Sequence, residues 1–139
     1  MLMPTYLTGV PILAGDWVRV LSGRGVWHHG IVRRLVPQWD GGIAVEIANN
    51  VKLAGISISD WHVFADGREI FLHRQAESAQ VPAILRRVDE SMGKTYSLLT
   101  QNCEHFASYA FTGVAESKTV TGVGVLVAAV VIIGLLGSN

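Results

Sequence analysis

The sequence predicts one α+β domain followed by an apolar segment. The first half of the chain alternates as β-strands do, helical patterns follow it, and residues 119–139 carry no charged side chain. A chain of 139 residues is long enough for one domain with a sizeable core. Its single cysteine excludes an intramolecular disulfide and a multi-thiolate metal site, so we expect neither a metal nor a cofactor.

Alternating and β-branched stretches, separated by turn residues, mark the predicted strands. Gly23-Arg24-Gly25 forms the first turn, and the breaker-rich stretch 37–42 makes the loop of a long hairpin. Asn49-Asn50 is interpreted as a further turn. The strands are therefore expected at 17–21, 26–36, 43–47, 51–58 and 69–73.

Helices follow in the second half of the domain. Ser59 and Asp60 are good caps for a short helix through Phe64, which Asp66-Gly67 ends. Pro82 suits an early helical position, and the apolar spacing after it predicts a helix that Gly93 ends. The helices are expected at 60–64, 82–92 and 102–112.

The C-terminal segment is predicted to be a membrane anchor. As a helix, 119–139 reaches about 30 Å, the thickness of the hydrocarbon core of a bilayer. The alternative is a core helix or strand of the domain itself. We expect a catalytic domain at 1–118 and an anchor at 119–139. The anchor contains three small residues that would let two tails approach closely and self-associate, Gly122, Gly124 and Gly134.

The net charge and the N-terminal residues indicate which partners and which cellular compartment to expect. Eleven Lys and Arg residues balance eleven Asp and Glu residues, which argues against nucleic acid as a partner. The first 15 residues lack a basic start and contain Pro4 and Pro11, so they do not resemble a secretory signal. Lys118 precedes the apolar segment and no basic residue follows it, which favours a cytoplasmic catalytic domain.

Cys103 is the candidate nucleophile because it is the only thiol and lies at a predicted helix start. Asn102 is a good N-cap type, so Cys103 falls in the first turn. There the backbone N–H groups and the helix dipole are expected to lower the pKa of the thiol. The alternative is a buried cysteine that packs as a small apolar side chain.

A thiol nucleophile needs a base within reach, and the histidines are few. His28 and His29 are neighbours on one predicted strand, so their side chains point to opposite faces and only one can face Cys103. His105 follows Cys103 by two positions on a helix and points about 200° away from it. Spacing alone leaves His28 and His29 open. Surface positions are expected for His62 and His73.

Several strings together resemble one family of thiol enzymes, the lecithin:retinol acyltransferase-like family. Asn102-Cys103-Glu104-His105-Phe106 resembles the signature around the family's cysteine, and residues 27–32 resemble its strand pattern of His, any residue, Gly or Ala, Ile. The resemblance covers residues 15–118. Further matching stretches are Gly15-Asp16, 59–67, 68–74 and 96–101.

The resemblance implies a fold, a chemistry and roles for residues. It implies a circularly permuted papain-like fold in which His28 is the base and Cys103 the nucleophile. It further implies an acyl thioester on Cys103, formed from a phospholipid substrate and passed to water, an amine or an alcohol.

One departure from the family pattern concerns the group that orients the base. Family members often carry a second histidine on the next strand, where this chain has Glu46. A carboxylate can accept a hydrogen bond from an imidazole, so Glu46 is the third candidate catalytic residue, with His62 as a weaker one. The alternative is an outward-facing glutamate, which would leave a weakened or non-catalytic site.

The leading hypothesis is therefore a membrane-associated thiol acyltransferase or phospholipase. A cysteine peptidase or amidase of the NlpC-like group ranks second. That group usually places cysteine before histidine, whereas this chain has the opposite order, and this chain shows no secretion signal. A non-catalytic membrane adaptor with a degenerate site is the third hypothesis.

Overall fold

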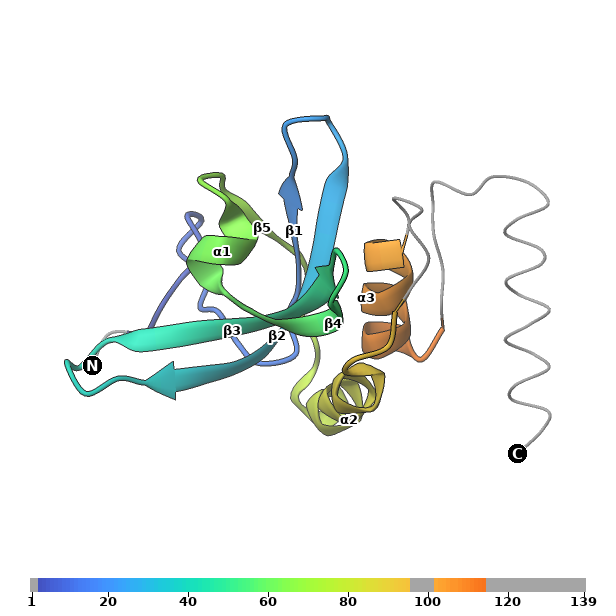
Figure 1. Ribbon diagram of the computed structural model, residues 1–139. Helices are drawn as coiled ribbons and strands as arrows, with labels where there is room; N and C mark the ends of the chain where they lie inside the picture. The colour runs from blue at the N-terminus through green and yellow to red at the C-terminus, as the bar shows by residue number, and fades with distance from the viewer. Residues whose placement is uncertain (1–2, 96–101, 115–139) are drawn as a thin grey trace.

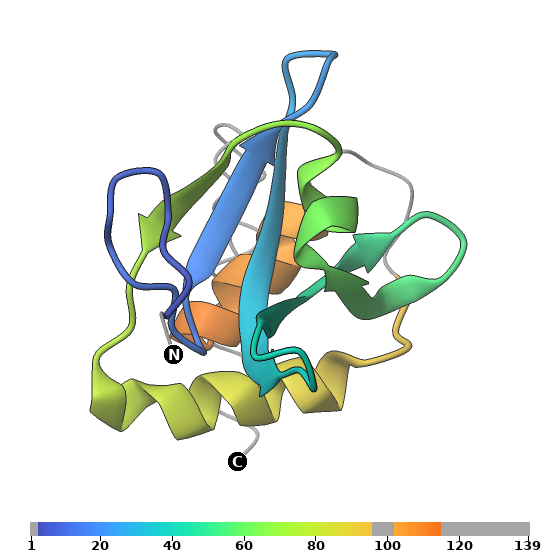
Figure 2. The ribbon, with the colours of Figure 1, turned by 90° about the vertical axis from the view of Figure 1, so that its left-hand side faces the viewer.

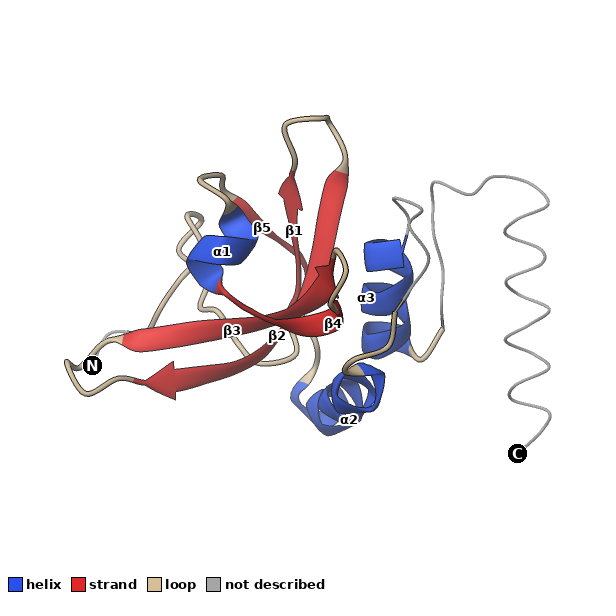
Figure 3. Cartoon of the chain, viewed as in Figure 1, coloured by secondary structure: helices blue, strands red, loops and turns tan. Residues whose placement is uncertain are grey.

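The computed structural model describes residues 3–95 and 102–114, which form a five-stranded antiparallel sheet with helices on both faces (Figures 1 and 3). The strand order is β4-β3-β2-β1-β5. This confirms the α+β prediction. The elements are β1 (Trp17–Leu21), β2 (Trp27–Pro37), β3 (Ile43–Val51), β4 (Gly55–Asp60), α1 (Trp61–Ala65), β5 (Ile70–Arg74), a 3-10 turn (Ser78–Gln80), α2 (Val81–Ser91) and α3 (Asn102–Thr112).

The sheet separates two apolar cores. In Figures 1 and 2, α1 covers one face while α3 lies against the other, with α2 running along the end of the sheet. Strand alternation sends Val32 and Ile47 to the α1 side, and Ile31 and Ala48 to the α3 side. The α1-side core also contains Tyr6, Ile12, Val18, Val20, Val45, Phe64, Ala65 and Ile70, and the α3-side core contains Trp17, Ile56, Ile84, Val88, Phe106, Ala107, Ala110 and Phe111.

The central strand β2 is longer than the ladder on either side of it. Its first residues, 27–29, pair with Leu21, Val20 and Arg19 of β1. Its ladder with β3 begins only at Gly30, which lies opposite Asn49. The β3-side backbone groups of 27–29 therefore have to find partners outside the sheet.

A buried carboxylate holds the N-terminal segment on the sheet. Asp16 accepts hydrogen bonds from the Tyr6 hydroxyl (2.7 Å) and the Leu13 amide (2.9 Å). Burial raises the pKa of Asp16 above its ordinary value, although both hydrogen bonds oppose the shift. The Gly15-Asp16 string therefore has a structural role, because it joins this segment to β1.

The structure corrects one turn of the sequence prediction. Asp60 caps α1 as expected, by accepting from the backbone amide of His62. However, β3 continues to Val51, and the turn to β4 falls at residues 52–54, with Leu53 at a positive φ of 70°. Asn49 is thus a buried strand residue and not a turn residue, and this change matters for the site.

The predicted membrane anchor at 119–139 lies outside the described residues. Within 3–95 and 102–114, no helix has the length and apolar character needed to cross a bilayer.

Candidate active site

Cys103 lies in the first turn of α3, against the end of β2 that pairs with β1 but not with β3. Its sulfur is 3.6 Å from the carbonyl oxygen of Trp27, to which the thiol can donate. The backbone N–H groups of His29, Cys103 and Glu104 point toward the same sulfur. The thiol therefore contacts the backbone on either side of His28.

The sulfur occupies the gap that β3 leaves beside β2. Val32 donates to Asp16 (2.9 Å) and Val26 accepts from Ser22 (2.8 Å), so the backbone groups of even-numbered β2 residues face β1. Those of the odd-numbered residues Trp27 and His29 consequently face the β3 side. Since β3 pairs only from Gly30 onward, the Cys103 sulfur takes the place of a strand partner there.

Burial has a larger effect on the thiol than the helix start does. The three backbone N–H groups lower the pKa of Cys103, but burial raises it more, and the net pKa lies above the ordinary value. The helix start lowers this pKa as expected, but burial reverses the direction of the net shift. A protonated resting thiol makes a nearby base necessary for nucleophilic attack.

His28 projects to the α1 face of the sheet. Its Nε2 lies 3.0 Å from Oδ1 of Asn49 on β3, and its ring packs on Phe64 with centroids 5.1 Å apart. Burial lowers the pKa of His28, while the hydrogen bond to Asn49 opposes that shift. The imidazole is therefore neutral at pH 7, which is the form a general base requires.

Asn49 determines which nitrogen of His28 carries the proton. The Asn49 amide nitrogen lies 2.9 Å from Ser59 Oγ, 3.2 Å from the Ile47 carbonyl and 3.4 Å from that of Ser57, which assigns Oδ1 as the acceptor. His28 Nε2 must then donate, and the lone pair of the neutral ring resides on Nδ1. Asn49 is 3% exposed, so water does not compete for this bond.

The contacts of the His28 ring and of the Cys103 sulfur both lie toward β3. The ring reaches across to Asn49 on β3, and Cys103 occupies the β3-side gap next to Trp27 and His29.

Because Gly30 has no Cβ, the Phe64 ring can pack under His28. A Cβ at this position would lie 2.6 Å from Ile47 Cγ2 and 2.9 Å from Phe64 Cε2, both too close. The small residue two positions after His28 thus lets Phe64 pack against the sheet beneath the imidazole.

His29 projects to the α3 face, which confirms that the two histidines point in opposite directions. Its Nδ1 accepts from the Trp17 indole N–H (2.9 Å), and its ring centroid lies 5.9 Å from that of His73. Burial, and then the positive charges of His73 and Arg19, lower the pKa of His29 to about 3. Trp17 is on β1 and His73 on β5, so the contacts of this ring lie toward β1 and β5.

The structure separates Glu46 from His28. Glu46 lies opposite Arg34 in the ladder and accepts from its guanidinium (2.7 Å), with Arg33 at 3.7 Å. By alternation it faces the side of Ala48, not the side of Asn49. Asn49, and not Glu46, therefore contacts the candidate base.

Asn49 was missed because two consecutive asparagines are typical of a turn. A usable signal was present nonetheless. Val45, Ile47 and Asn49 occupy alternate positions of one strand, which places the asparagine on the buried face that His28 shares.

The remaining candidates lie elsewhere. His62 is exposed on α1, and His73 packs edge-on against Trp17, with ring centroids 4.5 Å apart. Among the described residues, no three His, Cys, Asp or Glu side chains are placed to hold a metal ion.

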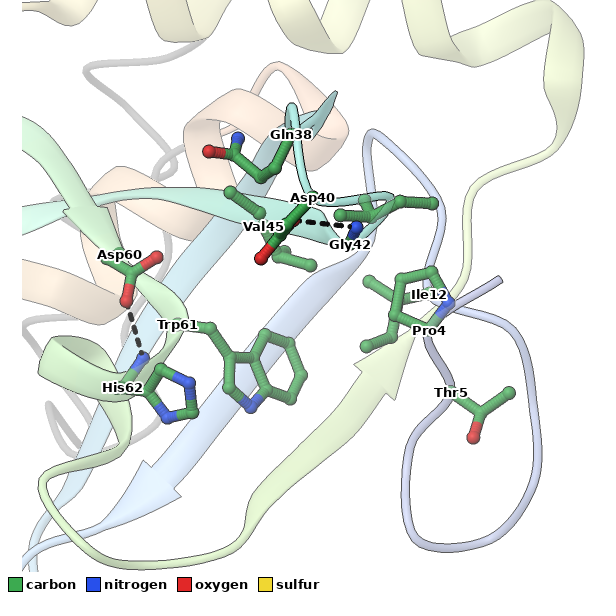
Figure 4. A pocket seen from close by; sticks show the side chains of 12 residues that line it. Pro4, Thr5, Ile12, Gln38, Asp40, Gly42, Val45, Asp60, Trp61 and His62 are labelled. Atoms are coloured by element: carbon green, nitrogen blue, oxygen red, sulfur yellow. Dashed lines mark hydrogen bonds between the residues drawn. The ribbon is translucent and has the colours of Figure 1, made fainter. Parts of the chain in front are cut away.

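A pocket of about 370 Å³ lies on the α1 side, where Trp61 extends toward the N-terminal segment (Figure 4). Neither Cys103 nor His28 lines it, so it is separate from the candidate active site. Its lining is Pro4, Thr5, Ile12, Gln38, Asp40, Gly42, Ile43, Ala44, Val45, Asp60, Trp61 and His62.

A buried thiol at a helix start, beside a strand histidine held by an amide, defines a thiol-enzyme type of site. The chain belongs to the lecithin retinol acyltransferase family, whose model matches residues 12–116. It is 41% identical over 69 residues to human lecithin retinol acyltransferase, an alignment that covers 45% of this chain and 30% of that relative. No solved structure gives a significant match. The resemblance drawn from the sequence is thereby confirmed, and the family supports an acyltransferase-type activity.

Proposed function

We propose that this protein is a thiol acyltransferase or phospholipase that forms an acyl thioester on Cys103. The observation that carries this proposal is the position of the Cys103 sulfur, which contacts the backbone on both sides of a half-buried, neutral histidine. Family membership supports acyl transfer as the reaction class. A phospholipid is the proposed acyl donor.

In the proposed first step, His28 Nδ1 takes the thiol proton as the Cys103 sulfur attacks the ester carbonyl carbon. The tetrahedral intermediate then collapses, the ester C–O bond breaks, and His28 returns the proton to the leaving alkoxide oxygen. Water, an amine or an alcohol attacks the thioester in the second step and regenerates the thiol. Backbone N–H groups at the start of α3 are suited to stabilise the oxyanion.

Asn49 completes the proposed catalytic group in the place for which Glu46 was predicted. By accepting the Nε2 proton it keeps the Nδ1 lone pair available to the thiol. It also favours the imidazolium that forms after proton transfer. The order of a strand histidine before a helix cysteine agrees with a circularly permuted papain-like fold, which we include in the proposal.

The decisive experiment is intact-mass analysis after incubation with phosphatidylcholine. We expect an acyl adduct that peptide mapping places on Cys103, and we expect Cys103→Ala to lose both adduct and turnover while its thermal unfolding stays close to that of the unaltered chain. Retained turnover in Cys103→Ala would overturn the mechanism. Labelling of Cys103 by peptide-based probes but not by lipid-based probes would favour a peptidase. If neither kind of probe labels Cys103, a non-catalytic adaptor would be favoured.

We further propose that residues 119–139 anchor the domain 1–118 to a membrane, with the domain on the cytoplasmic side. An uncharged segment of this length satisfies its backbone polar groups in lipid by becoming a helix. Deletion of 119–139 should give a folded domain that no longer sediments with vesicles yet still forms the Cys103 adduct. Unfolding of the truncated chain would instead assign the segment to the core.

A further inference from the structure

One row of side chains crosses the sheet next to the candidate nucleophile. Phe71 of β5, Arg19 of β1 and His29 of β2 are directly opposite one another in the ladders. The His29 amide is one of the groups that bond the Cys103 sulfur. Because adjacent strands lie about 4.8 Å apart, Arg19 stands one strand away from the residue that holds the thiol.

The Arg19 guanidinium packs on an aromatic ring and, among the described residues, pairs with no carboxylate. The guanidinium carbon lies 4.0 Å from the ring centroid of Trp27, whose carbonyl oxygen contacts Cys103. Among the described residues no acid pairs with Arg19, and its buried Nε has no hydrogen-bond partner. By contrast, Arg33, Arg34 and Arg86 each pair with a carboxylate.

A guanidinium stacked on a ring keeps its N–H donors in its own plane. These donors remain available for a bidentate bond to an anion such as a phosphate. The charge of Arg19 also acts on the site, since it is among the causes that lower the pKa of the neighbouring His29. Arg19 is therefore a cation without an acidic partner in the described part of the chain, one strand away from the residue that holds the nucleophile.

The surroundings of Arg19 are apolar and open. Leu21 and Phe71 are 40% and 42% exposed, and Trp27 packs edge-on against Phe71 with ring centroids 5.9 Å apart. The β1–β2 hairpin that carries Leu21 and Trp27 rises beyond the end of α3 in Figures 1 and 2. A cation flanked by exposed apolar side chains is complementary to a lipid that carries both acyl chains and a phosphate.

We propose that Arg19 binds the phosphate of a glycerophospholipid acyl donor, with Trp27 and Phe71 lining the adjoining apolar surface. This inference rests on the proposed acyl transfer at Cys103. In a glycerophospholipid the reacting ester and the phosphate are joined through the glycerol carbons. A spacing of one or two strands between Arg19 and the sulfur matches that short link.

The test compares two donors with the same acyl group, dihexanoyl phosphatidylcholine and p-nitrophenyl hexanoate, of which only the first has a phosphate. Arg19→Gln should raise KM for the phosphatidylcholine about tenfold, and it should leave hydrolysis of the nitrophenyl ester within about twofold. Arg24→Gln removes the same charge from the exposed turn of this hairpin and should change neither. Equal losses on both donors, or no change on either, would overturn the proposal.

A second measurement separates this proposal from the proposed function. Glycerophosphocholine should protect Cys103 from alkylation by iodoacetamide, and Arg19→Gln should abolish this protection, whether or not the protein turns over any ester. Hydrolysis of neither donor together with Arg19-dependent protection would reject the proposed function and retain the phosphate site. Protection that persists in Arg19→Gln, or equal protection by inorganic phosphate, would overturn the assignment to a phospholipid.

Discussion

His28 and His29 are neighbours in the chain, yet the two faces of the sheet give them different chemistry. On the α1 face, Asn49 accepts the Nε2 proton of His28 and leaves Nδ1 with its lone pair. On the α3 face, the Trp17 indole occupies Nδ1 of His29. The first ring contacts β3, and the second contacts β1 and β5.

This difference shows that neighbouring groups decide whether a histidine is suited to be a base. His29 is buried and His28 half-buried, and burial lowers the pKa of each. Only His28 has a partner that opposes the shift, because the Asn49 bond favours the protonated form. His29 faces two further positive groups, His73 and Arg19, which oppose its protonation.

The largest expected effect comes from removing the base. His28→Ala should reduce acyl turnover by about 10³-fold at pH 7, since general-base catalysis contributes about 10² to 10⁴. His29→Gln, which keeps an acceptor for the Trp17 indole, should stay within about fivefold. Steady-state assays of the two variants decide the assignment, and a larger loss in His29→Gln would reverse it.

The next effect is on acid stability and belongs to His29. Its folded pKa of about 3 lies below its ordinary value of 6.5, so between these values the unfolded chain binds a proton that the folded chain does not. Stability contributed by neutral His29 is therefore lost as pH falls below 6.5, by about 1.4 kcal/mol per unit.

Denaturant unfolding at pH 6.5 and pH 4.5 measures this loss, which should reach about 2 kcal/mol from His29 alone, because the unfolded histidine is already half protonated at pH 6.5. His29→Gln cannot titrate, so its stability should fall less over the same interval. An identical pH dependence in the two proteins would show that His29 does not keep its neutral form.

A smaller effect is expected from the group that orients the base. Asn49→Ala should lower kcat about 30-fold, within the range seen when a group that orients a functional side chain is removed. Because the bond to Asn49 raises the pKa of His28, its loss should also move the acidic limb of the pH–rate profile to lower pH. Loss of rate without that movement would indicate a purely structural role for Asn49.

Two matched controls accompany this variant. Asn50→Ala removes the neighbouring amide, and Glu46→Gln tests the carboxylate that the sequence suggested. Glu46 already pairs with Arg34 and Arg33, so its loss should change kcat by less than about twofold and leave the pH profile in place. A shifted profile in Glu46→Gln would restore it as the orienting group.

Local patterns in the sequence determined most of the fold and part of the site. Alternation and turn residues located β1 and β2, and the capping residue Asp60 located the start of α1. These features depend on neighbours within a few positions, which the sequence displays directly. The family strings in the sequence also indicate Cys103 and His28.

Tertiary structure alone decided how those residues are partnered. Asn49 reaches His28 only because β3 continues past the expected turn and pairs with β2 from Gly30 onward. The sign of the Cys103 pKa shift likewise required knowing how deeply the start of α3 is buried. Strand register and burial arise from contacts between segments that are distant in the sequence. A local pattern can therefore indicate which residue types form a site, but not which side chains they contact.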